Sequence, residues 1–230
     1  IPATIVVPHG NSVEKNSAMR SLGVVLIEHG DDFQESREFA MALAQEKSLH
    51  MVPAFHPWLV AGVATYSLEL HEAVADIDVG YVPIGLGSGI CGMMAVRDAL
   101  RLKTKVVGVV SAHASAYAQS FCAGHGVDSP VSTILSDGMA CRTPEPAALE
   151  LIMRGVDRIV QVTDDDVGAA MRMMFECTHN VCEGAGAAPL AAAYKERGKL
   201  TGQKVAVVAT GGNVDRDVFA GVLNEESDND

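Results

Sequence analysis

The pattern best suited to ligand binding is a glycine-rich turn between an apolar strand and a helix. An apolar run at residues 79–84 ends in the turn Gly85–Gly89, and a helical pattern follows from Ile90 to Leu100. Glycines let several backbone N–H groups converge on one point, and the helix N-terminus adds partial positive charge. The pattern predicts a cradle for an anion, usually a phosphate. A tight turn without any ligand explains the same glycines equally well.

A nucleotide is one possible source of that phosphate, and the spacing gives it weak support. The turn lacks the third glycine of a G-x-G-x-x-G fingerprint at its usual place, and no Lys-Ser/Thr follows as in a P-loop. The next apolar strand ends in Val110-Ser111, where a dinucleotide enzyme places an acidic residue for the ribose. A nucleotide-binding oxidoreductase is therefore retained only as an alternative.

Two further segments have the composition of binding loops. Thr210–Asn213 follows the last apolar strand, at the edge of a sheet where parallel-sheet proteins bind ligands. Glu183–Ala187 leads into a helix, and Glu183 also favours the helix dipole without any ligand. Each segment has a purely structural explanation when taken alone, as a turn and as a closely packed helix start.

Short apolar runs and helical patterns alternate along the chain. The runs are typical of strands buried on both faces, and they lie at residues 4–8, 24–27, 79–84, 106–110, 158–162 and 205–209. Helical patterns lie between them, at residues 11–20, from 31, at 64–75, at 90–100, from 163 and at 185–197, while residues 111–146 are less regular. The alternation predicts an α/β fold with a mostly parallel sheet covered by helices. The break at residues 53–58 predicts two lobes, residues 1–55 and 56–230.

The composition and charge of the chain argue against several classes of binding partner. The chain has 17 basic and 29 acidic residues and a formal net charge of −12, which argues against nucleic acid and against a polybasic membrane surface. No apolar run approaches the roughly 20 residues that cross a bilayer. The five cysteines form no C-x-x-C pair, so reduced thiols in a cytoplasmic protein are expected.

Taken in order, the three segments resemble one family, the fold-type II pyridoxal-phosphate enzymes, and within it the threonine/serine dehydratase (ammonia-lyase) branch. The family's P-x-G-G-G-G-L loop is matched by Pro83–Gly89, its E-P-A-G-A helix start by Glu183–Ala187, and its S-G-G-N loop by Thr210–Asn213. Gly184 stands where the family has proline. Thr178–Asn180 is similar to dehydratases of the hydroxyectoine-utilisation type. The resemblance implies a two-lobed, tryptophan synthase β-like fold.

The resemblance also implies a cofactor and a reaction. The cofactor is pyridoxal 5'-phosphate, with its phosphate on backbone N–H groups of the glycine loop and its pyridine nitrogen beside the Thr210 hydroxyl. The residues implied to bind it are Gly85, Leu86, Gly87, Ser88, Gly89, Thr210 and Glu183. The implied activity is a lyase that removes water and then ammonia from a small β-hydroxy amino acid, leaving a 2-oxo acid. A homodimer is the family expectation.

One departure from the family concerns catalysis. The family's Schiff-base lysine lies in an S-x-K-x-R-G motif that precedes the strand resembling residues 4–8, and this sequence contains no such motif. The seven lysines lie in polar contexts that do not depress an amine pKa. We therefore expect that an N-terminal part of the enzyme is missing and that this chain alone is inactive. A non-catalytic paralogue that binds the cofactor or another anion without the lysine is the alternative.

The other departure concerns metal ions. Some relatives place a metal-binding glutamate after the strand that follows the glycine loop, and Ser111 takes that place here. Asp164, Asp165 and Asp166 follow Thr163 with the spacing of a capping box, which predicts a solvated helix start. We expect no metal site.

Overall fold

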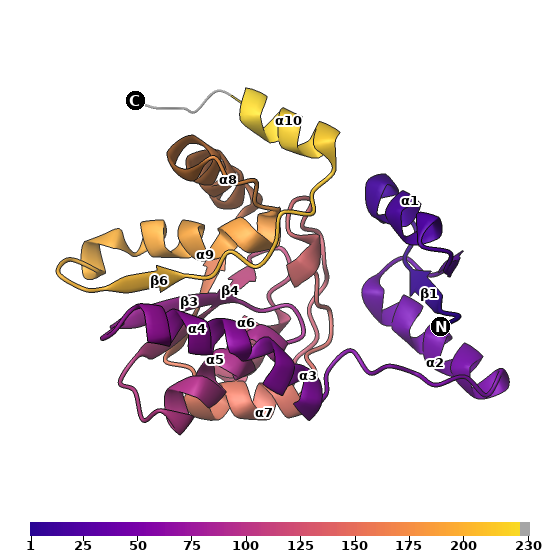
Figure 1. Ribbon diagram of the computed structural model, residues 1–230, viewed down its shortest axis with the longest axis horizontal. Coiled ribbons are helices and arrows are strands. Elements are labelled where there is room, and N and C mark those ends of the chain that lie inside the picture. Colours follow the sequence, from indigo (N-terminus) through magenta and orange to yellow (C-terminus); the bar gives the residue numbers. More distant parts are fainter. Residues whose placement is uncertain (226–230) are drawn as a thin grey trace. The chain divides into compact units, whose positions relative to one another are not determined.

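The computed structural model describes residues 1–225, which form two compact units (Figure 1). The first unit comprises residues 1–53 and 213–221, and the second comprises residues 54–212 and the segment from Val222 onward. Residues 213–221, which the predicted lobe boundary places in the second lobe, thus group with the first unit. The assignment of the two units to a small lobe and a cofactor-binding lobe stays a prediction.

The first unit contains two strands and two helices. Its elements are β1 (Thr4–Val7), α1 (Val13–Ser21), β2 (Val25–Glu28) and α2 (Phe33–Glu46), with the two strands paired in parallel. Both helices begin at side-chain caps: Ser12 Oγ accepts from the Lys15 N–H at 3.0 Å, and Asp32 Oδ1 accepts from the Glu35 N–H at 2.9 Å. These side-chain oxygens satisfy amides that have no partner within the helix.

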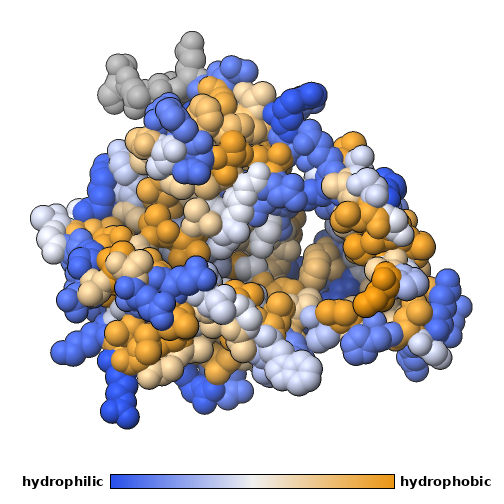
Figure 2. All heavy atoms as spheres, in the orientation of Figure 1, coloured by the Kyte–Doolittle hydropathy of each residue, from blue (hydrophilic) through white to orange (hydrophobic). Residues whose placement is uncertain are grey.

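This unit buries few apolar side chains. Val7 and Ala44 are buried, whereas Val13, Leu22 and Val25 are exposed, and Figure 2 shows hydrophobic residues on the visible surface of the unit. A two-stranded sheet covers little area, so a small core is what two strands and two helices provide.

The second unit is built on a four-stranded, wholly parallel sheet with the strand order β5-β4-β3-β6. The strands are β3 (Val79–Pro83), β4 (Lys105–Ser111), β5 (Arg158–Val162) and β6 (Val205–Val207). The helices are α3 (Pro57–Val63), α4 (Thr65–Ala73), α5 (Ser88–Ala99), α6 (Ala116–Ala123), α7 (Pro146–Gly155), α8 (Asp164–Thr178) and α9 (Gly184–Lys195), with the 3-10 turns η1 (Asp137–Met139) and η2 (Arg197–Lys199). The helix α10 (Arg216–Asn224) contains residues of both units.

Helices cover both faces of this sheet. α9 packs along the strands on one face with α8 behind it, while α5 packs on β3 and β4 on the other face with α7 behind it (Figure 1). Every residue of β3 is buried, as are Val106–Ser111 of β4. Central parallel strands covered on both sides require such continuous apolar runs. The predicted α/β class with a mostly parallel, helix-covered sheet is confirmed.

Three differences from the predicted elements matter for the site. The helix expected at residues 90–100 begins at Ser88, so Ser88 and Gly89 lie in its first turn. The strand expected at residues 205–209 ends at Val207, and the last backbone bond to β3 is the one from the Val208 N–H to the Tyr81 carbonyl at 3.1 Å. The sequence patterns also fail to predict α3, α6, α7 and α10. Within residues 1–225, no helix is both long and apolar enough to cross a membrane.

Candidate functional site

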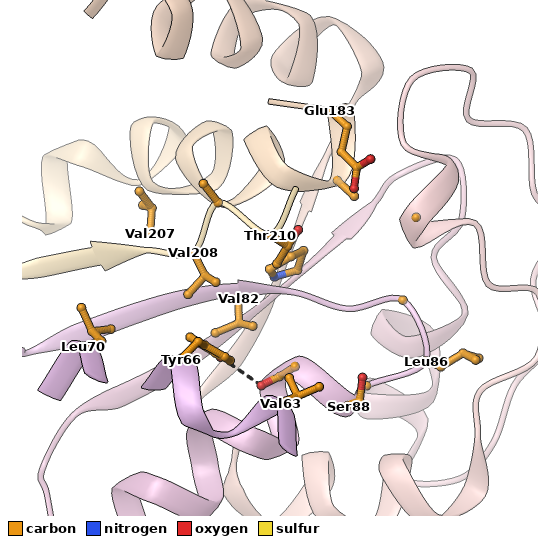
Figure 3. Close-up of a pocket in the computed structure, with 17 residues that line it drawn as sticks. Val63, Tyr66, Leu70, Val82, Leu86, Ser88, Glu183, Val207, Val208 and Thr210 are labelled. Atoms are coloured by element: carbon orange, nitrogen blue, oxygen red, sulfur yellow. Dashed lines mark hydrogen bonds between the residues drawn. The ribbon is translucent and has the colours of Figure 1, made fainter. Parts of the chain in front are cut away.

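A cavity of about 660 Å³ opens at the carboxyl end of the four-stranded sheet (Figure 3). Its walls come from the end of β3, the glycine loop, the segment after β6, the start of α9, and α3–α4. The lining residues are Val63, Tyr66, Leu70, Val82, Pro83, Gly85, Leu86, Gly87, Ser88, Gly89, Gly138, Glu183, Ala185, Val207, Val208, Ala209 and Thr210. All seven residues predicted to bind the cofactor are among them, which places the glycine loop and Thr210 around one space.

The glycines of the loop are required for different reasons. A Cβ at Gly85 would overlap the carbonyl oxygen of Gly138. Gly87 has φ of +96°, in the left-handed region, and a Cβ there would lie 2.8 Å from Ala148 Cβ. A Cβ at Gly89 would meet only Val82, at an ordinary 3.8 Å. Protein packing therefore does not demand glycine at position 89, whereas the close approach of a ligand to the backbone would.

The loop leads directly into the N-terminus of α5. Gly87 is the N-cap, so no cap side chain accepts from the first amides of the helix. The first N–H groups of a helix have no intrahelical partner, and the helix dipole adds partial positive charge there. These amides and the lining glycines fit a phosphate group.

The opposite wall is formed by backbone-to-backbone packing between Glu183–Gly186 and Thr210–Gly212. The Glu183 N–H donates to the Gly211 carbonyl at 3.0 Å. A Cβ at Gly186 would lie 2.5 Å from the same carbonyl oxygen. A Cβ at Gly211 would lie 2.9 Å from Glu183 Oε1. Because Gly186 and Gly211 have no side chains, the two segments approach closely, and Thr210 and Glu183 line the same cavity.

Gly184, the departure from the family's proline, also has a steric reason. A Cβ at this position would overlap the carbonyl oxygen of Leu135. The segment before η1 therefore packs on the first residue of α9 at a distance that only glycine allows.

Charge in the cavity is sparse. Among the lining residues within the described chain, Glu183 is the one formally charged side chain, and lysine, arginine and histidine are absent. Three lysines of the second unit bind elsewhere: Lys195 Nζ lies 3.2 Å from Asp166, Lys199 Nζ lies 3.1 Å from Glu196, and Lys204 Nζ donates to the Ala75 carbonyl at 2.5 Å. An anion in this cavity would depend on backbone amides.

The Cys91 thiol and the acidic residues at the start of α8 both have structural explanations. Burial raises the pKa of the Cys91 thiol, in the first turns of α5, to about 11, so the thiol is neutral at ordinary pH. The predicted capping box is confirmed: Thr163 Oγ1 accepts from the Asp166 N–H at 3.1 Å, and Asp166 Oδ2 accepts from the Thr163 N–H at 3.0 Å. Within residues 1–225, no group of three or more histidine, cysteine or acidic side chains is arranged to hold a metal ion.

Comparison with known proteins gives the family. Residues 1–211 match the family described as "Pyridoxal-phosphate dependent enzyme". The chain belongs to this family. Its identity to an L-threonine ammonia-lyase of Thermotoga maritima is 31% over 226 residues, which covers 98% of this chain and 56% of that protein.

Solved structures of this pyridoxal-phosphate family give the same picture. The processed form of threonine deaminase isoform 2 from Solanum lycopersicum has a TM-score of 0.86 and 27% identity, covering 96% of this chain and 65% of that one. Maize serine racemase has a TM-score of 0.86 and 26% identity, covering 96% and 69% respectively. The family and fold inferred from the three motifs are confirmed, and the chain spans little more than half the length of the Thermotoga protein.

Sequence reasoning missed the apolar wall of the cavity. Tyr66 and Leu70, on α4, line it together with Val207 at the end of β6 and Val208 just after it (Figure 3). Tyr66 and Leu70 have i, i+4 spacing, which predicts that their side chains lie on one face of the helix. This spacing does not predict a cavity, because helices that pack against a filled hydrophobic core have the same spacing.

Proposed function

We propose that this chain carries the cofactor-binding cavity of a pyridoxal 5'-phosphate-dependent ammonia-lyase acting on a small β-hydroxy amino acid of the threonine or serine type. The observation that carries the proposal is the convergence of the Gly85–Gly89 loop, Thr210 and Glu183 on one cavity. Relatives named threonine ammonia-lyase and threonine deaminase support the same reaction. Since the chain spans 56% of the first of these proteins, the activity of the whole protein is part of the proposal.

The residues present fit the cofactor. Backbone amides from Gly85 to Gly89 would hold the phosphate, with the N-terminus of α5 supplying positive potential where the described lining offers no cationic side chain. Thr210 would place its hydroxyl at the pyridine nitrogen, and Glu183 would border the ring. When bound, the cofactor supplies an electron sink for loss of the substrate's α-proton.

Thr210 sets how strong that sink is. A hydroxyl does not hold a proton on the pyridine nitrogen as a carboxylate does, because it carries no negative charge to stabilise the pyridinium. A neutral hydroxyl in that position would therefore suit loss of a β-hydroxyl group from the substrate better than prolonged storage of negative charge. Thr210 thus favours elimination, which agrees with a hydroxy amino acid as substrate.

Among the residues that the structure describes, the cavity lining holds no lysine, and we propose that this chain by itself binds the cofactor without turning over substrate. The same observation supports the second candidate, a cofactor-binding paralogue without lyase activity. The two candidates differ in the coding sequence upstream of Ile1. A lysine in an S-x-K-x-R-G motif there supports the lyase, and a complete reading frame without that lysine supports the paralogue.

Binding is the direct test. The protein is titrated with pyridoxal phosphate, and the cofactor's absorbance and the heat of binding are recorded. Saturable binding is expected, with pyridoxal binding far more weakly because it lacks the phosphate. NADH is the control for the oxidoreductase alternative and is expected not to bind. Saturation by NADH with no response to pyridoxal phosphate would contradict the proposal.

The proposal extends to the activity, the oligomeric state and the cellular location of the whole enzyme. The protein that also carries the S-x-K-x-R-G segment is expected to release ammonia and a 2-oxo acid from threonine or serine, whereas the chain printed above is expected to release neither. We also propose that the whole enzyme is a cytoplasmic homodimer. Sedimentation of the whole protein measures its mass, and fractionation of the source cells measures its location.

A further inference from the structure

Two tyrosine hydroxyls hold the backbone of the glycine loop. Tyr117 Oη donates to the Leu86 carbonyl at 3.0 Å. Tyr66 Oη donates to the Gly89 carbonyl at 3.0 Å, and Figure 3 shows this second bond. Tyr117 belongs to α6 and Tyr66 to α4, so the loop is tied to two helices distant in sequence from each other. Neither tyrosine belongs to the three motifs that reveal the family.

Tyr117 is fixed on both sides of its hydroxyl. The side chain is 1% exposed, and its oxygen accepts from the Glu145 N–H at 3.0 Å while donating to Leu86. Glu145 is the N-cap of α7. One phenol thus connects the glycine loop, α6 and the start of α7. Burial raises its pKa well above the usual range for tyrosine, so the hydroxyl remains a donor.

Tyr66 is held by close packing of α4 against α5. A Cβ at Gly92 of α5 would lie 3.1 Å from Ala64 Cα, so the corner before α4 rests on the α5 backbone. Burial raises the pKa of Tyr66 above its usual range as well. Its hydroxyl therefore also donates at any ordinary pH, to the carbonyl of the second residue of α5.

A bond to a loop carbonyl fixes the direction of the adjacent amide. In a trans peptide the C=O and the following N–H point in opposite directions, and the chain contains no cis peptide within the described residues. Holding the Leu86 carbonyl toward Tyr117 therefore directs the Gly87 N–H away from Tyr117. Glycine has the freest backbone of all residues, so an unrestrained loop would lose this orientation readily.

We propose that Tyr66 and Tyr117 are positioning residues that hold the carbonyls of the Gly85–Gly89 loop and thereby preorganise its amides for the phosphate of the ligand. This inference rests on the proposed function, since the ligand is the cofactor named there. The two tyrosines act through the loop and need not touch the ligand. Removing either hydroxyl leaves the ring and its packing, while the loop gains backbone freedom that binding must then remove.

The chain provides its own controls, because it has four tyrosines. Tyr81 is 0% exposed but donates to Glu196, away from the loop, and Tyr194 is 51% exposed. The test compares Tyr117→Phe and Tyr66→Phe with Tyr81→Phe and Tyr194→Phe in the intact chain. Amide hydrogen exchange of the peptide spanning residues 85–89 is measured without ligand, together with melting temperature and the Kd values for pyridoxal phosphate and inorganic phosphate.

The expected result separates the loop from general stability. Loss of one hydrogen bond corresponds to a factor of about three to ten, so Tyr117→Phe and Tyr66→Phe should raise loop exchange and both Kd values by that factor. Tyr81→Phe should lower the melting temperature and leave loop exchange unchanged, and Tyr194→Phe should change neither. Loop exchange in Tyr117→Phe and Tyr66→Phe equal to that in Tyr81→Phe would overturn the inference. Faster loop exchange in a protein that binds neither probe would overturn the proposed function and leave the role of the tyrosines standing.

Discussion

The two ends of α9 achieve tight packing by opposite means. At its N-terminus, Gly184 and Gly186 bring the helix backbone against Leu135 and Gly211 without side chains between them. At its C-terminus, Glu196 accepts from Tyr81 Oη at 2.8 Å and from Arg158 Nη2 at 2.5 Å. The N-terminus of α9 borders the cavity. Its C-terminus forms a cluster of hydrogen-bonded polar side chains with Tyr81 and Arg158.

The difference shows where this fold leaves polar groups for a ligand. At the cavity end, the amides at the start of α5 face no cap side chain, and cationic side chains are absent from the described lining. At the Glu196 end, the carboxylate and phenol bind one another and the guanidinium, and a second cation, Lys199, lies 3.1 Å from the carboxylate. Buried polar groups are normally satisfied in this way. Substitutions at the two ends should therefore affect ligand binding and stability separately.

The largest effect is expected at the glycine end. Gly186→Ala places a Cβ against the Gly211 carbonyl, and backbone must move to accommodate it. We expect the affinity for pyridoxal phosphate to fall by about two orders of magnitude, because Thr210–Gly212 shifts, with a loss of about 1–3 kcal/mol in unfolding free energy. Gly198→Ala is the matched control, since a Cβ there meets nothing within 4 Å. Calorimetric titration of both variants checks the prediction, and equal affinities would contradict it.

The next effect concerns stability at the Glu196 end. Glu196→Ala leaves Arg158 and Tyr81 without their shared acceptor and is expected to cost about 3 kcal/mol of unfolding free energy. Affinity for pyridoxal phosphate should stay within about twofold, because the cavity lies at the other end of the helix. Denaturant unfolding measures the first quantity and titration the second. Glu150→Gln, on an exposed pair with Arg154, is the control and should cost almost nothing.

The pH dependence follows from the same carboxylate. Burial alone would raise the pKa of Glu196, but hydrogen bonds from Arg158, Tyr81 and Lys199 outweigh burial and lower it from 4.5 to about 2. The unfolded chain then takes up a proton first as pH falls, so the stabilisation is present above pH 4.5 and is lost as pH falls toward 2. The loss should approach 3 kcal/mol and disappear in Glu196→Gln. Urea unfolding at a series of pH values gives the unfolding free energy of both proteins. The same dependence of that free energy on pH in both would contradict the role given to Glu196.

The cavity segments could be predicted from the sequence, whereas the polar cluster around Glu196 could not. The segments Gly85–Gly89 and Thr210–Asn213 were recognisable because glycine runs after apolar strands signal a local backbone requirement. The cluster of Tyr81, Arg158 and Glu196 was not, because it joins residues up to 115 positions apart through the sheet register. The helix α7, which the hydrophobic pattern does not predict, begins with Pro146, and proline in the first turn is itself typical of a helix start.

The smallest effect is expected from the side chain that the cavity end does contribute. Thr210→Ser keeps the hydroxyl, so the affinity for pyridoxal phosphate should stay within about threefold, whereas Thr210→Val removes the hydroxyl and should weaken binding by about tenfold. Backbone amides supply most of the binding at this end, so both changes should remain well below that of Gly186→Ala. Thr201→Val, at an exposed turn away from the lining, is the control for loss of a threonine hydroxyl. If Thr210→Val weakened binding as much as Gly186→Ala, side chains and not the glycine-packed backbone would dominate the cavity end, and the contrast with the Glu196 end would be lost.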